Sequence, residues 1–149
     1  MSDHNNDQVR SLVDALNNVM VGLMKVGGSG TFGMVREGMA AVSFLREARE
    51  SFSGNQLIQQ VIETVMNRVQ GGSSEESVAY DQPEDAMLAQ IGAAVAGLQG
   101  EDGLQFRQML LQFAEKVASA AGQGLFGSGE KISSGEANFL AKLQQVLGL

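Results

Sequence analysis

The sequence predicts an all-α protein of about six helices packed as one compact bundle. Apolar residues recur at helical spacing in six separate stretches, and no stretch shows the alternation of a half-buried strand. Glycine-rich or polar breaks separate these stretches, as expected between helices. With 149 residues, 44% of them hydrophobic, the chain suits a single domain spanning residues 1–149 with an ordinary core.

The first predicted helix carries apolar residues at helical spacing from Val9 onward, over about five turns. The polar leader, residues 1–7, is expected to be frayed, and Asp7 or Asn6 is expected to cap the helix. The helix should end at residues 27–30, where three glycines allow the left-handed conformation that other residues avoid.

Two further helices are predicted before the middle of the chain. Thr31 is the expected cap of the first of these, which runs to about Glu50. Ser53 and Gln56 form a capping box for the next, and its wide apolar arc places that helix near the centre. The apolar faces are expected to include Met34, Met39, Val42 and Leu45, and then Leu57, Ile58, Val61, Ile62, Val65 and Met66.

Residues 71–82 lack a sustained period and predict a flexible loop that divides the chain nearly in half. Pro83 is expected at the first position of a fourth helix, where its missing N–H costs nothing. Asp102 with Gln105, and then Ser133, are the expected caps of the last two helices. Their buried faces should carry Met87, Leu88, Ile91 and Val95, then Leu104, Phe106, Met109, Leu110, Phe113 and Val117, then Phe139, Leu140, Leu143, Val146 and Leu147.

A short internal repeat relates the two halves. The Gly-Ser-Gly at residues 28–30 recurs at residues 127–129, and Glu37 recurs as Glu136 at the same offset. Each copy follows one long amphipathic stretch and precedes another. The repeat therefore predicts two pseudo-symmetric helical hairpin halves joined by the loop at 71–82.

The bend and helix start at residues 129–136, GEKISSGE, followed by Phe139, Leu140 and Leu143, resemble the TerB-like tellurite-resistance family. The resemblance implies a small, acidic, pseudo-symmetric helical protein that acts in stress response, with a protein partner or within a membrane complex. It also implies clustered acidic residues that bind a divalent cation. The aspartate that often precedes the bend glycine in that family is Ser29 in one copy here and Ser128 in the other, which weakens the expectation of a metal site.

Three glutamates are the candidate metal ligands, and they have two interpretations. Glu37, Glu130 and Glu136 could form a carboxylate cluster for calcium if the two bends meet, since hard cations take several oxygen ligands. The favoured interpretation is structural: Glu136 with Ser133 makes a capping box, and Glu37 suits the dipole of an early helical turn. No cofactor other than such a cation is expected.

Composition disfavours several functional classes. The net charge of −7, the 5% aromatic content and the absence of Trp disfavour nucleic-acid binding. The chain has no cysteine and one histidine, His4, so the usual thiol and imidazole catalysts are absent or unplaced, and we do not expect an enzyme. The sequence contains neither a secretion signal nor a membrane-spanning run, which predicts a cytoplasmic protein.

Two functional hypotheses from different classes follow. The first is a non-catalytic binding or interaction module of TerB-like kind, with a protein partner and weak divalent-cation binding. The alternative is a structural protein that self-associates through small-residue surfaces such as residues 92–97, GAAVAG, without a small-molecule ligand.

Overall fold

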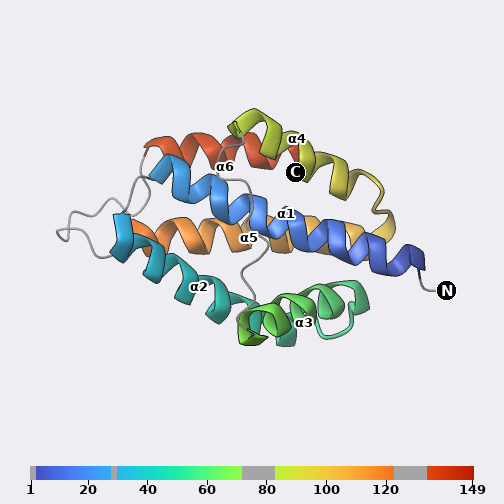
Figure 1. Cartoon of the computed structure of the whole chain (residues 1–149). Helices are drawn as coiled ribbons and strands as arrows, with labels where there is room; N and C mark the ends of the chain where they lie inside the picture. The colour runs from blue at the N-terminus through green and yellow to red at the C-terminus, as the bar shows by residue number, and fades with distance from the viewer. Residues whose placement is uncertain (1–2, 28–29, 72–82, 123–133) are drawn as a thin grey trace.

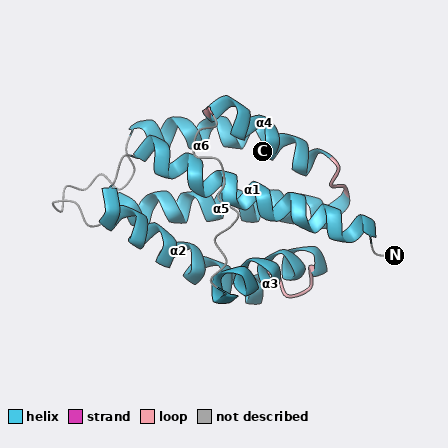
Figure 2. Cartoon of the chain, viewed as in Figure 1, coloured by secondary structure: helices cyan, strands magenta, loops and turns pink. Residues whose placement is uncertain are grey.

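The computed structural model describes residues 3–27, 30–71, 83–122 and 134–149, and over these residues it consists of six α-helices without a strand. Figure 2 shows short turns as the only other described structure. The prediction of an all-α bundle is therefore confirmed. The helices are α1 (Asp3–Gly27), α2 (Gly30–Ser51), α3 (Gln56–Gly71), α4 (Glu84–Ala96), α5 (Gly100–Gly122) and α6 (Ser134–Val146).

Helices α1 and α5 form the centre of the bundle (Figure 1). In that view α4 and α6 lie on one side of this central pair, and α2 and α3 lie on the other. Helix α1 packs against α3, α4, α5 and α6, and α5 packs against α1, α2, α3 and α6. The expectation that the third helix is central was wrong: α3 lies at the edge, and its wide apolar arc leaves Leu57, Val65 and Met66 only partly buried.

The core is built from aliphatic side chains and phenylalanines. Between α2 and α5 the rings of Phe44 and Phe113 meet edge to face, with centroids 5.9 Å apart and planes inclined by 62°, a geometry that aromatic quadrupoles favour. The largest fully buried side chains are Phe106, Phe139, Leu12, Leu23, Ile58, Ile62, Met87, Ile91, Met109, Leu110, Leu143 and Leu147.

Two residues that the sequence pattern assigned to buried faces are exposed. Met39 is 68% exposed on α2, and Leu104 is 44% exposed on α5. Each precedes a buried residue of its helix, Ala41 or Phe106, by two positions. Two positions correspond to about 200° around an α-helix, so each side chain points to the opposite side.

Several helix boundaries differ from the predicted ones. Helix α1 begins at Asp3, so residues 3–7 of the expected frayed leader are helical. Helix α2 already includes Thr31, its predicted cap. Pro83 is the N-cap of α4, with φ −67° and ψ 155°, rather than its first helical residue.

Helix α5 begins before its predicted cap. It starts at Gly100, which takes φ +72°, so Asp102 lies within the first turn. Gly71 ends α3, whereas the rest of the predicted loop 71–82 lies outside the described residues. The cap predicted at Ser133 lies outside them as well.

The helix ends that flank the two glycine-rich bends lie at one end of the bundle (Figure 1). These are the carboxyl ends of α1 and α5 and the amino ends of α2 and α6. The hairpins are unequal, because α2 has 22 residues and α6 has 13. The pseudo-two-fold relation of the halves stays a prediction. None of the described helices combines the length and the apolar content that crossing a bilayer requires.

Candidate functional site

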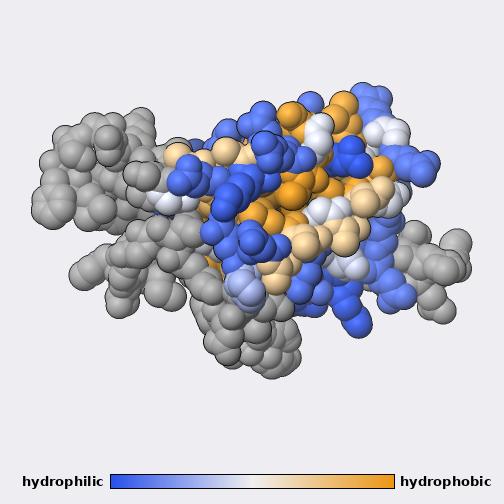
Figure 3. Space-filling view, turned by 90° about the horizontal axis from the view of Figure 1, so that it is seen from above, coloured by the Kyte–Doolittle hydropathy of each residue, from blue (hydrophilic) through white to orange (hydrophobic). Residues whose placement is uncertain are grey.

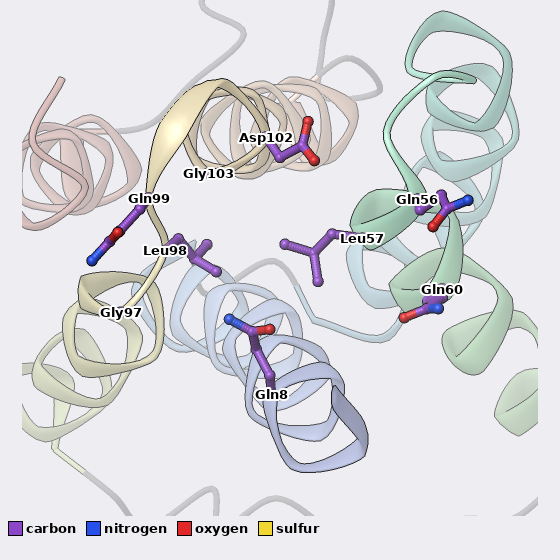
Figure 4. Close-up of a pocket in the computed structure, with 9 residues that line it drawn as sticks. All are labelled: Gln8, Gln56, Leu57, Gln60, Gly97, Leu98, Gln99, Asp102 and Gly103. Carbon is purple, nitrogen blue, oxygen red and sulfur yellow. The ribbon is translucent and has the colours of Figure 1, made fainter. Parts of the chain in front are cut away.

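An open pocket of about 310 Å³ lies where the amino-terminal part of α1, the start of α3 and the turn between α4 and α5 converge (Figure 4). We call it the carboxamide pocket because four glutamines contribute to its wall. Its lining consists of Gln8, Gln56, Leu57, Gln60, Gly97, Leu98, Gln99, Asp102 and Gly103.

The centre of the carboxamide pocket is apolar and its rim is polar. The side chains of Leu57 and Leu98 point toward each other across the space, and Gln8 rises toward them from α1 (Figure 4). Each glutamine amide can both donate and accept hydrogen bonds. Asp102 supplies the only charge among the described side chains of the lining. The pocket can therefore hold a group with an apolar part and a polar end.

Asn55 fixes the α3 side of this pocket. Its side chain is 1% exposed, and its Oδ1 accepts from the N–H of Ile58 at 3.1 Å, which caps α3. Its Nδ2 donates to Gln105 Oε1 at 3.0 Å and to the carbonyl of Asp102 at 3.2 Å, both on α5. The capping box predicted at Ser53 was wrong, because the chain forms a turn there and Asn55 immediately precedes the helix.

The turn between α4 and α5 fixes the opposite side. Arg107 Nη2 donates to the carbonyl oxygens of Val95 at 3.1 Å and Leu98 at 3.2 Å, so a cation meets the carboxyl end of α4, where the helix dipole is negative. Gly103 is pressed against this turn: a Cβ there would lie 2.8 Å from the Leu98 Cβ. These contacts from α5 hold Leu98 in place in the turn.

A second pocket of about 320 Å³ lies between α1 and α4 and is lined by Ser11, Asp14, Ala15, Asn18, Gln90, Ala93 and Ala94. The buried Asn18 donates from Nδ2 to Gln90 Oε1 at 3.1 Å across it. This bond joins the two helices, so two of the polar side chains in the lining are already hydrogen-bonded to each other. We therefore regard the carboxamide pocket as the stronger ligand site.

The three predicted metal ligands are only partly described. Glu136 lies in the first turn of α6 and is 2% exposed. Glu37 belongs to α2, but its side chain is outside the described part, and so is the whole of Glu130. Among the described residues, no group of three or more His, Asp or Glu side chains is placed to hold a metal ion. The cation site stays a prediction.

The small residues of α4 have two different surroundings. A Cβ on Gly92 would lie 3.6 Å from Val146 Cβ, so this glycine already packs against α6 within the chain. A Cβ on Gly97 would meet nothing within 4 Å, and Ala93 and Ala96 are exposed.

Figure 3 shows apolar surface on the face seen from above, the side on which α4 and α6 lie in Figure 1. An ion pair between Lys142 of α6 and Glu84 of α4, at 3.5 Å, joins these two helices.

The carboxamide pocket was missed by sequence reasoning. The spacing of Gln56 and Gln60 puts both on one side of α3, which is a weak local signal. Gln8 and Gln99 come from distant segments, and no local pattern links them to α3. Only the packing of α1 against α3 and α5 brings these residues together.

No protein-family model, no curated protein and no solved structure matches this chain.

Proposed function

We propose that this protein is a non-catalytic helical interaction module that binds a protein partner in the carboxamide pocket. The observation that carries the proposal is the lining of that pocket, in which four glutamines and one aspartate accompany two leucines that face each other. An apolar site with a few converging polar groups is typical of ligand binding. Nucleophilic catalysis needs an activated nucleophile beside a base, and the described lining offers no such pair.

A polypeptide segment is the ligand class that the lining fits best. Peptide groups carry one donor and one acceptor, and glutamine amides pair with both. The fixed walls support this proposal, because Asn55 and Arg107 hold the two sides through buried or partly buried hydrogen bonds. A site held in shape before binding loses less conformational entropy when the ligand arrives.

The resemblance of residues 129–136 to the TerB-like family supports a stress-response role for this module in the cytoplasm, with weak divalent-cation binding at Glu37, Glu130 and Glu136 as a further property. The readout is tellurite tolerance of a strain that lacks the protein. Restoration by the wild-type chain supports the role, and unchanged tolerance on deletion contradicts it.

Selection of peptides from a random displayed library on the full chain tests the proposed function. Binding of the enriched peptides is then measured by fluorescence anisotropy with wild type, Gln8→Ala and Gln60→Ala. The matched control is Gln144→Ala, an exposed glutamine on α6 outside the pocket. We expect both pocket variants to weaken binding at least about tenfold and the control to leave it unchanged. Failure to enrich any peptide, or equal binding by all variants, would contradict the proposal.

Self-association is the second candidate, favoured by the exposed Ala93 and Ala96 on α4 and Gly97 at its C-cap. Sedimentation velocity over about a hundredfold range of concentration tests it. A size that rises with concentration and returns to monomer in Ala93→Glu would support assembly through α4. A constant monomer would exclude it.

A further inference from the structure

We propose that the carboxamide pocket receives the side chain of a lysine from the partner, an inference that rests on the proposed function above. A lysine side chain combines a flexible four-carbon stem with an ammonium group that donates three hydrogen bonds. The pocket offers both complements, since two leucines form its centre and a carboxylate and carboxamides form its rim. Its volume of about 310 Å³ is at the small end for ligand pockets, which suits one side chain.

The two leucines provide the surface for the stem. Leu98 is buried and Leu57 is half-buried, and their side chains face each other across the space (Figure 4). Methylene groups placed between them would be transferred from water to an apolar surface. This transfer is favourable by about 0.8 kcal/mol for each fully buried CH₂. Arg107 and Gly103 fix the position of Leu98, so this surface exists before the ligand arrives.

The polar groups favour a cation over an anion. Among the described residues, Asp102 is the only charged member of the lining and has no ion-pair partner. The starts of α3 and α5 would favour an anion by their dipoles. However, Asn55 already caps α3, and Glu101 and Asp102 place two carboxylates in the first turn of α5. None of the described side chains that line the pocket is cationic, so none of them would receive an anion.

The arrangement of acceptors selects lysine over arginine. Asp102 lies on α5, Gln56 and Gln60 on α3 and Gln8 on α1, so acceptor groups surround the pocket from three helices. An ammonium group donates in three directions and can form hydrogen bonds with acceptors on several of these helices at once. A guanidinium group is planar, and it pairs best with a single carboxylate through two parallel hydrogen bonds. The net charge of −7 further attracts a basic partner segment.

Nuclear magnetic resonance titration of the full chain with a capped single lysine (Nα-acetyl-lysine N-methylamide) tests the inference. We expect concentration-dependent shifts of the side-chain amides of Gln8 and Gln60 and of the backbone amides of Leu57 and Leu98. Capped norleucine keeps the four-carbon stem and lacks the ammonium, so it should bind at least about tenfold more weakly. Capped arginine should also bind more weakly than capped lysine.

Asp102→Asn removes the carboxylate and keeps the backbone carbonyl that accepts from Asn55. This variant should bind capped lysine at least about tenfold more weakly and no longer distinguish it from norleucine. The matched control is Glu101→Gln, which removes the same charge from the neighbouring residue, exposed and outside the lining. Its binding should equal that of wild type, and thermal melting of both variants checks that each is folded.

Three results would overturn the lysine assignment: equal binding of norleucine, equal loss in Glu101→Gln and Asp102→Asn, or tighter binding of cadaverine than of capped lysine. The last result would assign the pocket to a free small amine. If capped lysine fails while the selected peptides still require Gln60, the lysine inference falls and the proposed function stands. If neither binds, the proposed function falls as well.

Discussion

Asn55 Nδ2 lies 3.0 Å from Gln105 Oε1, and this bond joins residues 50 positions apart in the chain. The same buried side chain also caps α3, so one amide both starts a helix and attaches it to α5. Every polar atom of this side chain is hydrogen-bonded, a condition under which burial of an amide is tolerated. The α3 side of the carboxamide pocket therefore depends on one residue.

Asn55→Ala should lower the free energy of unfolding by about 2–3 kcal/mol. About 1 kcal/mol comes from loss of the helix cap, and the rest from acceptors on α5 left without their donor. Urea unfolding measures the change. The control is Ser53→Ala at the exposed position where the sequence predicted the cap, and it should change stability by less than about 0.5 kcal/mol. A larger effect at Ser53 than at Asn55 would restore the predicted capping box.

Gly22→Ala should destabilise the contact between α1 and α6. A Cβ at Gly22 would lie 2.5 Å from Cζ of the fully buried Phe139 ring, so the helices must separate or the ring must move. Overpacking of this kind costs about 1–3 kcal/mol. Phe139→Leu in the same chain should relieve part of the cost, which a double-mutant cycle of urea unfolding measures.

Gly38→Ala is the matched control for that experiment, since a Cβ at this helical position of α2 would meet nothing within 4 Å. Alanine lowers the entropy of the unfolded chain and is the better helix former. Stability should therefore rise by about 0.5–1 kcal/mol. If both glycine variants destabilise equally, close approach to Phe139 is not the cause.

Arg107→Lys should weaken the turn between α4 and α5. Arg107 Nη2 donates to two carbonyl oxygens, those of Val95 and Leu98, and the shorter side chain of lysine does not carry its ammonium group as far. We expect a loss of about 1–2 kcal/mol in thermal or urea unfolding. Arg46→Lys, at an exposed position of α2, should be neutral. Faster hydrogen exchange confined to the α4–α5 turn would identify the cause, whereas uniform exchange would contradict it.

Glu136→Gln should lower stability by about 0.5–1 kcal/mol, because a negative charge in the first turn of α6 interacts favourably with the helix dipole. If Glu136 is structural, the loss is the same in millimolar calcium and in chelator. A stabilisation by calcium that disappears in Glu136→Gln, and also in Glu37→Gln, would instead establish the cation site. Urea unfolding under both conditions separates the two interpretations.

Helix number and type could be predicted from the sequence, because apolar residues at a 3.6-residue period must share a buried side. Boundaries were less predictable where capping motifs compete. Ser53 and Asn55 are both good caps, and only the bonds from Asn55 to α5 decide between them. The burial of Met39 and Leu104 was misjudged because an apolar residue at the margin of a stripe can lie on either side.

The position of α3 and the carboxamide pocket could not be predicted, since both depend on which helices pack together. The width of an apolar face indicates how much of a helix is buried, but it does not indicate which helix packs against it. The pocket combines residues from Gln8 to Gly103, and their polarity alone suggests only solvated surface. Conversely, Glu37, Glu130 and Glu136 were linked by a repeat of which residues 28–29 and 127–129 lie outside the described residues.

The central place of α1 has a consequence for how this protein is made. Its buried residues Leu12, Leu16, Val19 and Leu23 belong to the common core. Among the described residues, α1 packs mainly against α3, α4, α5 and α6, and three of these helices follow residue 83. During synthesis the apolar side of α1 therefore stays largely uncovered until the second half of the chain has emerged. Nascent chains stalled before α4 should engage chaperones that bind exposed apolar helices, and release should follow completion of α6.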